Sequence, residues 1–318
     1  MKVVLASNHL GPEYPARLQA EFPDVEFAYA LTQEGQLEAV RDADVFFGWP
    51  DAEIFEVASN LKWIACPGTG IDKIVEVPVI RDSDIPLTNA PGAHVPPMAD
   101  HVVGMMVALA HNFRELYRDQ DQRVFNTRNW GGRMEELGGR RIGIFGYGEL
   151  GRAVAYRAAA FNMDVKAVDP NPGSDTGAAS EIWSLDRLDE LVTTSDWLII
   201  AAPYIPATHH VIDAVRIRSM KRGSRIIVIS RGGIVDEDAL ADAIADGHLA
   251  GAGLDATEIE PLPTGSPLWD QKHMIITQHA SALTPELYEG RRLVFIDNLR
   301  RFVNGEPLEH ICDKSAGY

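Results

Sequence analysis

The amino-acid sequence predicts an α/β protein in which parallel β-sheets are covered by helices on both faces. Short apolar runs, mostly four to six residues long and rich in Val and Ile, recur along the 318 residues. The runs are continuous rather than alternating, which is typical of parallel strands buried on both faces. Segments of about 10–20 residues with helical spacing separate the runs, so the chain consists of repeated strand–helix units.

The predicted strands fall into two groups, which indicates two domains. The first group lies before residue 90 and comprises Val3–Ala6, Val45–Phe47 and Trp63–Cys66. The second group begins at Arg141 and comprises Ile142–Phe145, Asp164–Val168, Trp197–Ala202, Arg225–Ile229, Ala252–Leu254 and Met274–Thr277. A chain of this length holds about two domains of ordinary size.

A long apolar segment, Met98–Phe113, lies between the two groups of strands. It is shorter than the roughly 20 residues that a membrane-spanning helix needs. It also contains Asp100, His101 and His111. We interpret the segment as a buried helix that joins the two domains.

Composition and charge exclude several classes of protein. The chain is 46% hydrophobic and 24% charged, which is typical of a folded globular protein. Its formal net charge of −17 makes nucleic acid and anionic membrane surfaces poor partners. Cys66 and Cys312 are its two cysteines, so no disulfide framework is expected, and without an HExxH pattern or a Cys/His cluster no metal site is expected. The N-terminal apolar run is shorter than a secretory signal requires, so a cytoplasmic location is expected.

A glycine-rich turn follows the predicted strand Arg141–Phe145. Gly146, Gly148 and Gly151 have the GxGxxG spacing, and an Ala-rich helix follows them. In this context the first glycine allows a tight turn, the second lets the backbone approach a pyrophosphate, and the third permits close packing of helix and strand. The N–H groups at the start of the helix then bind the anion. The pattern therefore predicts a Rossmann dinucleotide-binding domain.

The next strand ends at Asp169, eighteen residues after Gly151. A carboxylate at this place accepts hydrogen bonds from the 2′-hydroxyl of the adenosine ribose. It would repel a 2′-phosphate, and the residues that follow, Pro170–Pro172, include no arginine to receive one. The sequence therefore favours NAD over NADP.

Three side chains with complementary chemistry follow later strands of the second group. Arg231 comes just after one strand, Glu260 lies on a proline-flanked loop after the next, and His279 ends the last. The carboxyl ends of parallel strands meet at one edge of the sheet, where ligands bind. An arginine, a carboxylate and an imidazole beside a nicotinamide are the groups needed for hydride transfer to a keto acid.

With these residues in view, the sequence resembles the family of D-isomer-specific 2-hydroxyacid dehydrogenases along nearly its whole length. Besides the glycine fingerprint, the resemblance is carried by ordered motifs: LKWI and GTGID (61–72), TNAPG (88–92), APYIPATHHVI (202–212), SRGGIVDEDAL (230–240), LDATEIEPLP (254–263) and TQHASALTPE (277–286). The resemblance implies a Rossmann domain inserted into a flavodoxin-like substrate domain. We place the domains at residues 1–97, 98–285 and 286–318, the last returning to the substrate domain.

The resemblance also implies a role for each matched residue. His279 matches the general acid/base, Glu260 the carboxylate that fixes its tautomer, and Arg231 the arginine that binds the substrate. Thr69 and Gly70 match the loop that offers backbone N–H groups to the substrate carboxylate. The implied contacts with NAD are Gly146, Tyr147, Gly148, Glu149, Leu150, Gly151, Asp169, Ala202, Pro203, Thr208, Ile229, Ser230, Asp255, His279 and Ser281.

Some positions depart from the family pattern. Gln278 stands where the family usually has proline, Ala282 replaces a common glycine, and Thr257 replaces an aromatic residue. His94 occupies a position where asparagine is frequent, on the cleft side of the substrate domain. We therefore hypothesise that His94 contacts the substrate or the cofactor.

The sequence predicts an NAD-dependent enzyme that interconverts a D-2-hydroxy acid and its 2-keto acid. The helix after Pro97 resembles the dimerisation region of the family, so a homodimer is expected. Two alternatives stay open: a formate or phosphite dehydrogenase of the same family, and an NAD-sensing protein similar to the co-repressors built on this fold. Glu260 argues against formate, because the formate branch typically carries Gln there. The identity of the 2-hydroxy acid also stays open.

Overall fold

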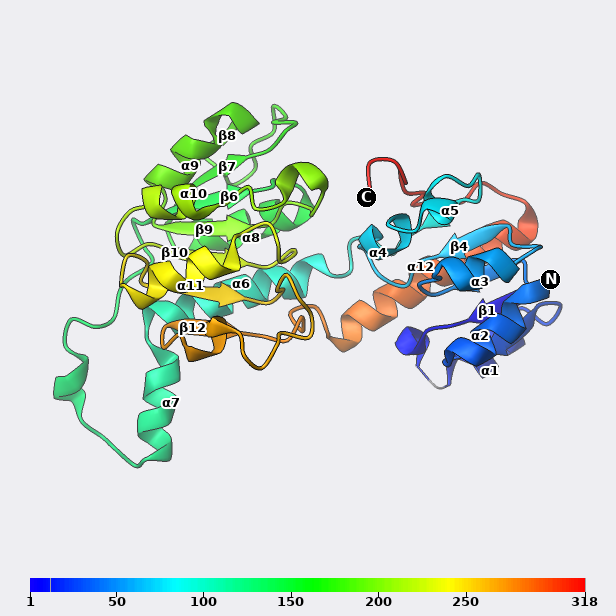
Figure 1. Cartoon of the computed structure of the whole chain (residues 1–318), viewed down its shortest axis with the longest axis horizontal. Coiled ribbons are helices and arrows are strands. Elements are labelled where there is room, and N and C mark those ends of the chain that lie inside the picture. The colour runs from blue at the N-terminus through cyan, green and yellow to red at the C-terminus, as the bar shows by residue number, and fades with distance from the viewer. Residues whose placement is uncertain (12, 318) are drawn as a thin grey trace. The chain divides into compact units, whose positions relative to one another are not determined.

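The chain folds into two α/β units, each with its own parallel sheet (Figure 1). The computed structural model describes residues 1–11 and 13–317, without the side chains of residues 128 and 129. The first unit comprises Met1–His94 and Leu283–Tyr318, and the second comprises Val95–Ala282. The first unit is therefore discontinuous in sequence. The boundaries expected from the sequence, after residues 97 and 285, lie three residues from these.

The first unit has a five-stranded sheet with the order β2-β1-β3-β4-β5. This is the flavodoxin-like order, in which the chain winds first to one side of β1 and then to the other. Its strands are β1 (Lys2–Leu5), β2 (Glu26–Tyr29), β3 (Val45–Phe47), β4 (Trp63–Ala65) and β5 (Leu87–Thr88). Its helices are α1 (Tyr14–Glu21), α2 (Gln33–Ala39), α3 (Ala52–Val57), α4 (Asp72–Val75), α5 (Pro78–Arg81) and α12 (Pro285–Asn304), with the 3₁₀ turns η1 (Asn8–Leu10) and η2 (Val40–Asp42).

The second unit has a seven-stranded sheet with the order β12-β11-β10-β9-β6-β7-β8. Strands β7 and β8 are added on one side of β6, and β9 to β12 are added on the other side, beginning with β9. A doubly wound sheet binds its ligand at this point, where the order of the strands reverses. The strands are β6 (Arg141–Phe145), β7 (Asp164–Val168), β8 (Glu181–Trp183), β9 (Trp197–Ile200), β10 (Arg225–Val228), β11 (Gly251–Leu254) and β12 (Met274–Ile276). The helices are α6 (Val95–Ala110), α7 (Phe113–Asp121), α8 (Glu149–Ala160), α9 (Leu188–Thr194), α10 (Ala214–Ser219) and α11 (Glu237–Ala245), with η3 (Thr127–Trp130), η4 (Leu185–Arg187), η5 (Pro206–Thr208) and η6 (Pro267–Asp270).

Helix α6 corresponds to the long apolar segment, but it starts and ends three residues earlier than expected. It ends at Ala110 because Asn112 adopts a left-handed backbone (φ +51°), after which α7 begins at Phe113. Its buried face packs against the sheet of the second unit. Gly253 makes this packing possible, since a Cβ there would lie 2.7 Å from the sulfur of Met105. No helix among the described residues is both long and apolar enough to cross a membrane.

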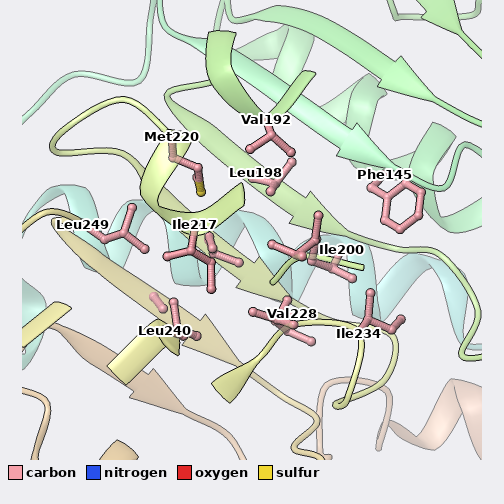
Figure 2. Packing of buried hydrophobic residues seen from close by; sticks show 14 of the residues in the cluster. Phe145, Val192, Leu198, Ile200, Ile217, Met220, Val228, Ile234, Leu240 and Leu249 are labelled. Atoms are coloured by element: carbon pink, nitrogen blue, oxygen red, sulfur yellow. The ribbon is translucent and has the colours of Figure 1, made fainter. Parts of the chain in front are cut away.

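Apolar side chains of the central strands form the core of the second unit. Figure 2 shows Leu198, Ile200 and Val228 of β9 and β10 packed against Ile217 of α10 and Leu240 of α11. Burying each of these side chains contributes about 1.5–3 kcal/mol. This core fixes the ends of β6, β9 and β10, from which the loops of the site arise.

Strands β2, β5 and β8 were not predicted from the sequence, because none of them has a continuous apolar run of ordinary strand length. β2 and β8 are edge strands whose residues are mostly exposed or half-buried, so neither presents a continuous apolar run. β5 contains two residues. Sheet pairing forms these strands despite their weak local pattern.

Candidate active site

His279 and Glu260 form a hydrogen-bonded pair at the carboxyl edge of the seven-stranded sheet. Glu260 follows β11, and His279 follows β12. The Nδ1 atom of His279 lies 2.9 Å from Oε2 and 3.1 Å from Oε1 of Glu260. Both side chains are partly exposed, 48% for His279 and 33% for Glu260. Since Nδ1 faces the carboxylate, the proton on Nδ1 is donated to Glu260 and Nε2 is left for a ligand.

Asp255 holds the loop that carries His279. Its buried carboxylate accepts the hydroxyl of Thr277 at 2.6 Å and the backbone N–H groups of Ala280 and Ser281 at 3.0 and 3.2 Å. The His279 N–H donates to the Asp255 carbonyl at 2.8 Å, with the His279 backbone at φ +53°. The structure therefore gives Asp255 and Ser281 a role in loop geometry. Their contact with the cofactor stays a prediction.

His101 is a member of this network that the sequence did not reveal. Its Nε2 atom lies 2.9 Å from the hydroxyl of Thr277 and 4.0 Å from Asp255. It reaches the loop from α6, and 176 residues separate it from Thr277. No local spacing pattern links two residues so far apart.

Arg231 lies on the loop after β10, against the loop that carries Glu260. A Cβ on the neighbouring Gly232 would lie 2.0 Å from the backbone carbon of Thr257, so only glycine lets the two loops approach this closely. The Arg231 guanidinium donates to the carbonyl of Ser230 at 2.9 Å. The second unit therefore brings Arg231, Glu260 and His279 to neighbouring loops at one edge of its sheet.

The glycine turn after β6 has the geometry of a dinucleotide site. Gly146 has φ +94°, and a Cβ there would lie 2.4 Å from the nitrogen of Ala202. A Cβ on Gly151 would lie 2.2 Å from the Gly146 carbonyl oxygen. A Cβ on Gly148 would meet nothing within 4 Å, so this glycine borders open space at the start of α8. That space fits the approach of a pyrophosphate to the helix N-terminus.

Asp169 lies beside this turn at the end of β7. Its Oδ2 atom accepts the N–H of Tyr147 at 2.8 Å, and its Oδ1 atom accepts the N–H of Asn171 at 2.9 Å. The Tyr147 ring is buried, and its hydroxyl accepts the N–H of Ala179 at 3.0 Å and donates to the Thr176 carbonyl at 2.8 Å. Burial raises the pKa of the Tyr147 hydroxyl. The Tyr147 side chain therefore anchors the loop that contains Thr176 and Ala179.

Two further predicted cofactor residues lie at the start of α8. Glu149 is its first residue, and Leu150 is buried.

Arg152, on α8, lies near the loop that follows β7. It was missed in the sequence because only residues 170–172 were considered as partners for a 2′-phosphate. Its guanidinium lies over the Tyr147 ring, 4.8 Å from the ring centroid, and donates to the Asp175 carbonyl at 2.9 Å. It also lies 3.9 Å from the Asp175 carboxylate. This basic group is therefore already engaged by Asp175.

The remaining predicted cofactor residues line loops at the same sheet edge. The hydroxyl of Thr208 closes its own turn, donating to the Pro203 carbonyl at 2.9 Å and accepting the Ile205 N–H at 2.8 Å. Ser230 donates to the Ile200 carbonyl at 3.2 Å. Ala202 and Ile229 are buried. These residues shape the loops, and their contact with NAD stays a prediction.

In the first unit, the loop Gly68–Gly70 is held by residues that follow β5. The Thr69 hydroxyl lies 3.0 Å from Nδ1 of His94 and donates to the Ala90 carbonyl at 3.0 Å. Asn89 donates to the Thr69 carbonyl at 2.8 Å. His94 is thus in contact with the loop expected to bind substrate. The hypothesis that His94 itself contacts substrate or cofactor stays a prediction.

A group of polar side chains lies beside the Glu260 loop. His210 pairs with Glu258 at 3.0 Å and stacks on His209, with ring centroids 4.0 Å apart. Ligand atoms of these three residues lie within 4.8 Å of one another, an arrangement that a search for sequence motifs does not detect. The neighbouring Glu237 accepts the Glu258 N–H at 2.7 Å, and burial, with nearby carboxylates, raises the pKa of Glu237 to about 7.

Comparison with known proteins identifies related chains. The chain is 33% identical over 285 residues to a protein of Staphylococcus haemolyticus named as a 2-hydroxyacid dehydrogenase, covering 87% of this chain and 88% of that protein. It is 30% identical over 301 residues to D-3-phosphoglycerate dehydrogenase of Methanocaldococcus jannaschii, covering 93% of this chain. It spans 57% of the length of that enzyme.

Solved structures share the fold along the full chain. A D-isomer specific 2-hydroxyacid dehydrogenase of Xanthobacter autotrophicus Py2, in complex with NADPH and MES, superposes with a TM-score of 0.83 at 27% identity, covering 100% of this chain and 99% of that one. An NAD-dependent formate dehydrogenase of Staphylococcus aureus, in complex with NAD, gives 0.82 at 29% identity, covering 99% and 98%. Related chains thus bind either NAD or NADPH.

The strongest assignment comes from the second unit. Residues 103–281, more than half of the chain, match the model of the "D-isomer specific 2-hydroxyacid dehydrogenase, NAD binding domain". The matched range contains the glycine turn, Asp169, Arg231 and the His279–Glu260 pair. The chain therefore belongs to the family of D-isomer specific 2-hydroxyacid dehydrogenases.

Proposed function

We propose that this protein is an NAD-dependent oxidoreductase that interconverts a 2-keto acid and its D-2-hydroxy acid. The observation that carries the proposal is the His279–Glu260 hydrogen bond, with Arg231 on the adjoining loop of the same unit. Membership of the family supports the reaction class. The substrate and the roles of the individual residues are part of the proposal.

Reduction of a 2-keto acid needs a hydride at C2 and a proton on the carbonyl oxygen. A bound nicotinamide supplies the hydride. His279 gives the proton from Nε2 to the oxygen, and in the reverse direction takes it back. Glu260 holds the Nδ1–H side of the ring and stabilises the imidazolium form, so the ring keeps one orientation through the cycle.

Arg231 and the loop Thr69–Gly70 would hold the substrate carboxylate. A guanidinium binds a carboxylate through two parallel N–H donors, which fixes the orientation of the keto group as well as its position. The Thr69 loop is kept rigid by its hydrogen bonds to Asn89, Ala90 and His94. A rigid loop can present backbone N–H groups without further ordering on binding.

We propose NAD as the cofactor. The open space at Gly148 and the start of α8 fits the pyrophosphate, and the Asp169 carboxylate fits the ribose hydroxyls. A 2′-phosphate beside Asp169 would be repelled, and the nearby Arg152 of α8 is engaged by Asp175. Because a 27%-identical relative was solved with NADPH, the preference of this protein for NAD over NADP is part of the test below.

Formate oxidation is the second candidate, because an NAD-dependent formate dehydrogenase is 29% identical to this chain. Loss of hydride from formate yields carbon dioxide and moves no proton, so it needs no general acid. The carboxylate–imidazole pair of Glu260 and His279 therefore favours keto-acid reduction.

The test is NADH oxidation against a panel of 2-keto acids, with formate and NAD⁺ in a parallel assay and NADPH replacing NADH in a third. We expect reduction of at least one keto acid, a preference for NADH, and no turnover of formate. Turnover of formate alone would support the second candidate. Rates equal to those of Arg231→Ala across the panel would contradict the enzyme and favour an NAD-sensing protein.

We also propose that the protein acts as a cytoplasmic homodimer. Both cysteines are free thiols, as a reducing compartment would keep them. The segment after α6 exposes large apolar side chains, including Tyr117 and the almost fully exposed Phe125. Figure 1 shows α7 and the loop after it extending away from the seven-stranded sheet, as a dimerisation arm would.

A further inference from the structure

Arg291, on α12 of the first unit, is a half-buried cation. Its Nη1 atom donates to Nδ1 of His9 at 3.2 Å, and its Nε atom is buried without a hydrogen-bond partner. Among the described residues, no carboxylate forms an ion pair with it. Burial lowers the pKa of the Arg291 guanidinium, because a charge that is taken out of water is destabilised when no opposite charge compensates it.

The other arginines of the same helix are all paired. Arg292 lies 3.1 Å from Glu289, Arg300 lies 2.7 Å from Glu21, and Arg301 lies 2.8 Å from Asp297. Each of these three guanidinium groups therefore has a carboxylate partner. Arg291 differs in having no carboxylate partner in the described part of the chain.

His9 completes a set of hydrogen-bond donors. It lies in η1 after β1, with its ring edge-on to Trp49 at 5.1 Å and to Tyr288 at 5.9 Å. Burial, followed by the charge of Arg291, lowers the pKa of His9 to about 4, so the ring is neutral at neutral pH. Because Nδ1 accepts from Arg291, the ring proton is on Nε2, which is a donor. Donors around a cation suit an anionic ligand.

The cluster lies at the carboxyl edge of the five-stranded sheet, next to the proposed substrate loop. A Cβ on Gly68 would lie 3.3 Å from the Trp49 ring, and a Cβ on Gly290 would lie 2.5 Å from that of Ala93. Arg291 also lines a small cavity together with Cys66, Asn89 and Ala90. These residues flank or support the loop Gly68–Gly70.

We propose that Arg291 and His9, flanked by Trp49 and Tyr288, form a second anion subsite that binds a terminal carboxylate or phosphate of the substrate. The inference rests on the proposed function and narrows it to 2-keto acids with an anionic group at the far end. Within the first unit, the Thr69 loop would bind the carboxylate beside the keto group, and Arg291 would bind the distal anion.

The first test compares substrates in pairs that differ in the distal charge. The pairs are 2-ketoglutarate with 4-methyl-2-oxopentanoate, and 3-phosphohydroxypyruvate with hydroxypyruvate. We expect kcat/KM to be at least about tenfold higher for the anionic member of one pair, and that pair identifies carboxylate or phosphate as the ligand. Equal kcat/KM values within both pairs would overturn the inference while leaving the keto-acid reductase intact.

The second test uses Arg291→Met, with Arg292→Met as the matched control. Arg291→Met should remove the preference for the anionic member, mainly through KM, and Arg291→Lys should restore part of it. Arg292→Met should keep the preference, since Arg292 already pairs with Glu289. A preference that survives in Arg291→Met would overturn the subsite.

A third measurement is independent of turnover. Removing a half-buried charge that has no carboxylate partner should raise the Tm of the ligand-free protein in Arg291→Met. The same variant should lose the increase in Tm that 2-ketoglutarate or 3-phosphoglycerate gives to the wild-type protein. If no 2-keto acid is reduced but this increase depends on Arg291, the proposed function fails and the anion subsite stands. An increase that is unchanged in Arg291→Met overturns the subsite.

Discussion

At the residue scale, the His279 loop is defined by one buried carboxylate and one exposed carboxylate. Asp255 collects the Thr277 hydroxyl and two backbone N–H groups, which fixes the loop in its left-handed turn at His279. Glu260 then meets the imidazole from the opposite loop. The sequence motif predicted Glu260 and His279 as partners, while the supporting role of Asp255 and His101 depends on contacts that only the folded chain brings together.

Glu260→Gln should lower kcat strongly with a smaller effect on KM. Glutamine keeps a hydrogen-bonding oxygen but no charge to stabilise the imidazolium form of His279, so we expect a loss of about 100-fold. Steady-state kinetics with the best keto acid measures this. Glu258→Gln is the control, because Glu258 lies on the same loop as Glu260 but pairs with His210 instead of His279. Equal losses in the two variants would contradict the assignment of Glu260.

Glu237 should make stability depend on pH. Its pKa in the folded chain is about 7, above the ordinary value of 4.5. The folded state therefore keeps a proton that the unfolded state releases, and stability falls as pH rises from about 4.5 to 7. Glu237→Gln removes this penalty, at most about 3 kcal/mol, and still accepts the Glu258 N–H. Urea denaturation should show a gain for the variant at pH 8 and almost none at pH 4.5. A similar gain at both pH values would contradict the cause.

At the scale of elements, the strands that are buried on both faces were predictable and the edge strands were not. β6, β9 and β10 are continuous apolar runs, whereas β2 and β8 owe their form to pairing with a neighbour. The glycine turn was also predictable, since its spacing lies within one strand–helix unit. The pairing of His9 with Arg291 was not, because 282 residues separate them.

Two glycines of the turn, Gly148 and Gly151, should respond differently to alanine. Gly148→Ala should leave stability within about 0.5 kcal/mol, because its Cβ meets nothing in the protein. The methyl group would occupy the space proposed for the pyrophosphate, so the Kd for NADH should rise about tenfold or more. Gly151→Ala should lose about 1–3 kcal/mol of stability as well, since its Cβ meets the Gly146 carbonyl. Urea denaturation and NADH titration of both variants measure these effects. Unchanged NADH binding in Gly148→Ala would contradict the site.

At the scale of the whole molecule, the acidic chain binds small anions through local groups. The net charge of −17 disfavours polyanions. It does not prevent binding at a helix N-terminus or at a single arginine, where the local field decides. The two units explain why the sequence indicated two domains. The first unit is interrupted in sequence by the second, because the chain returns to the first unit through α12.

Phe125 should contribute to the proposed homodimer. An almost fully exposed phenylalanine (96%) on an extended arm is costly unless a second subunit covers it. Phe125→Glu should shift the protein from dimer to monomer in light scattering after size-exclusion chromatography. Tyr156→Glu, at another exposed aromatic side chain on α8, should not. A monomeric wild-type protein, or a dimer unaffected by Phe125→Glu, would contradict this role.

The most direct test of the central claim follows the hydride itself. NADH carrying deuterium at both C4 positions of the nicotinamide is incubated with the best 2-keto acid, and the product is analysed by mass spectrometry and chiral chromatography. The proposed function predicts the D-2-hydroxy acid with one deuterium at C2, and almost no product from His279→Ala. An L product, a product without deuterium at C2, or the same rate without His279 would contradict it.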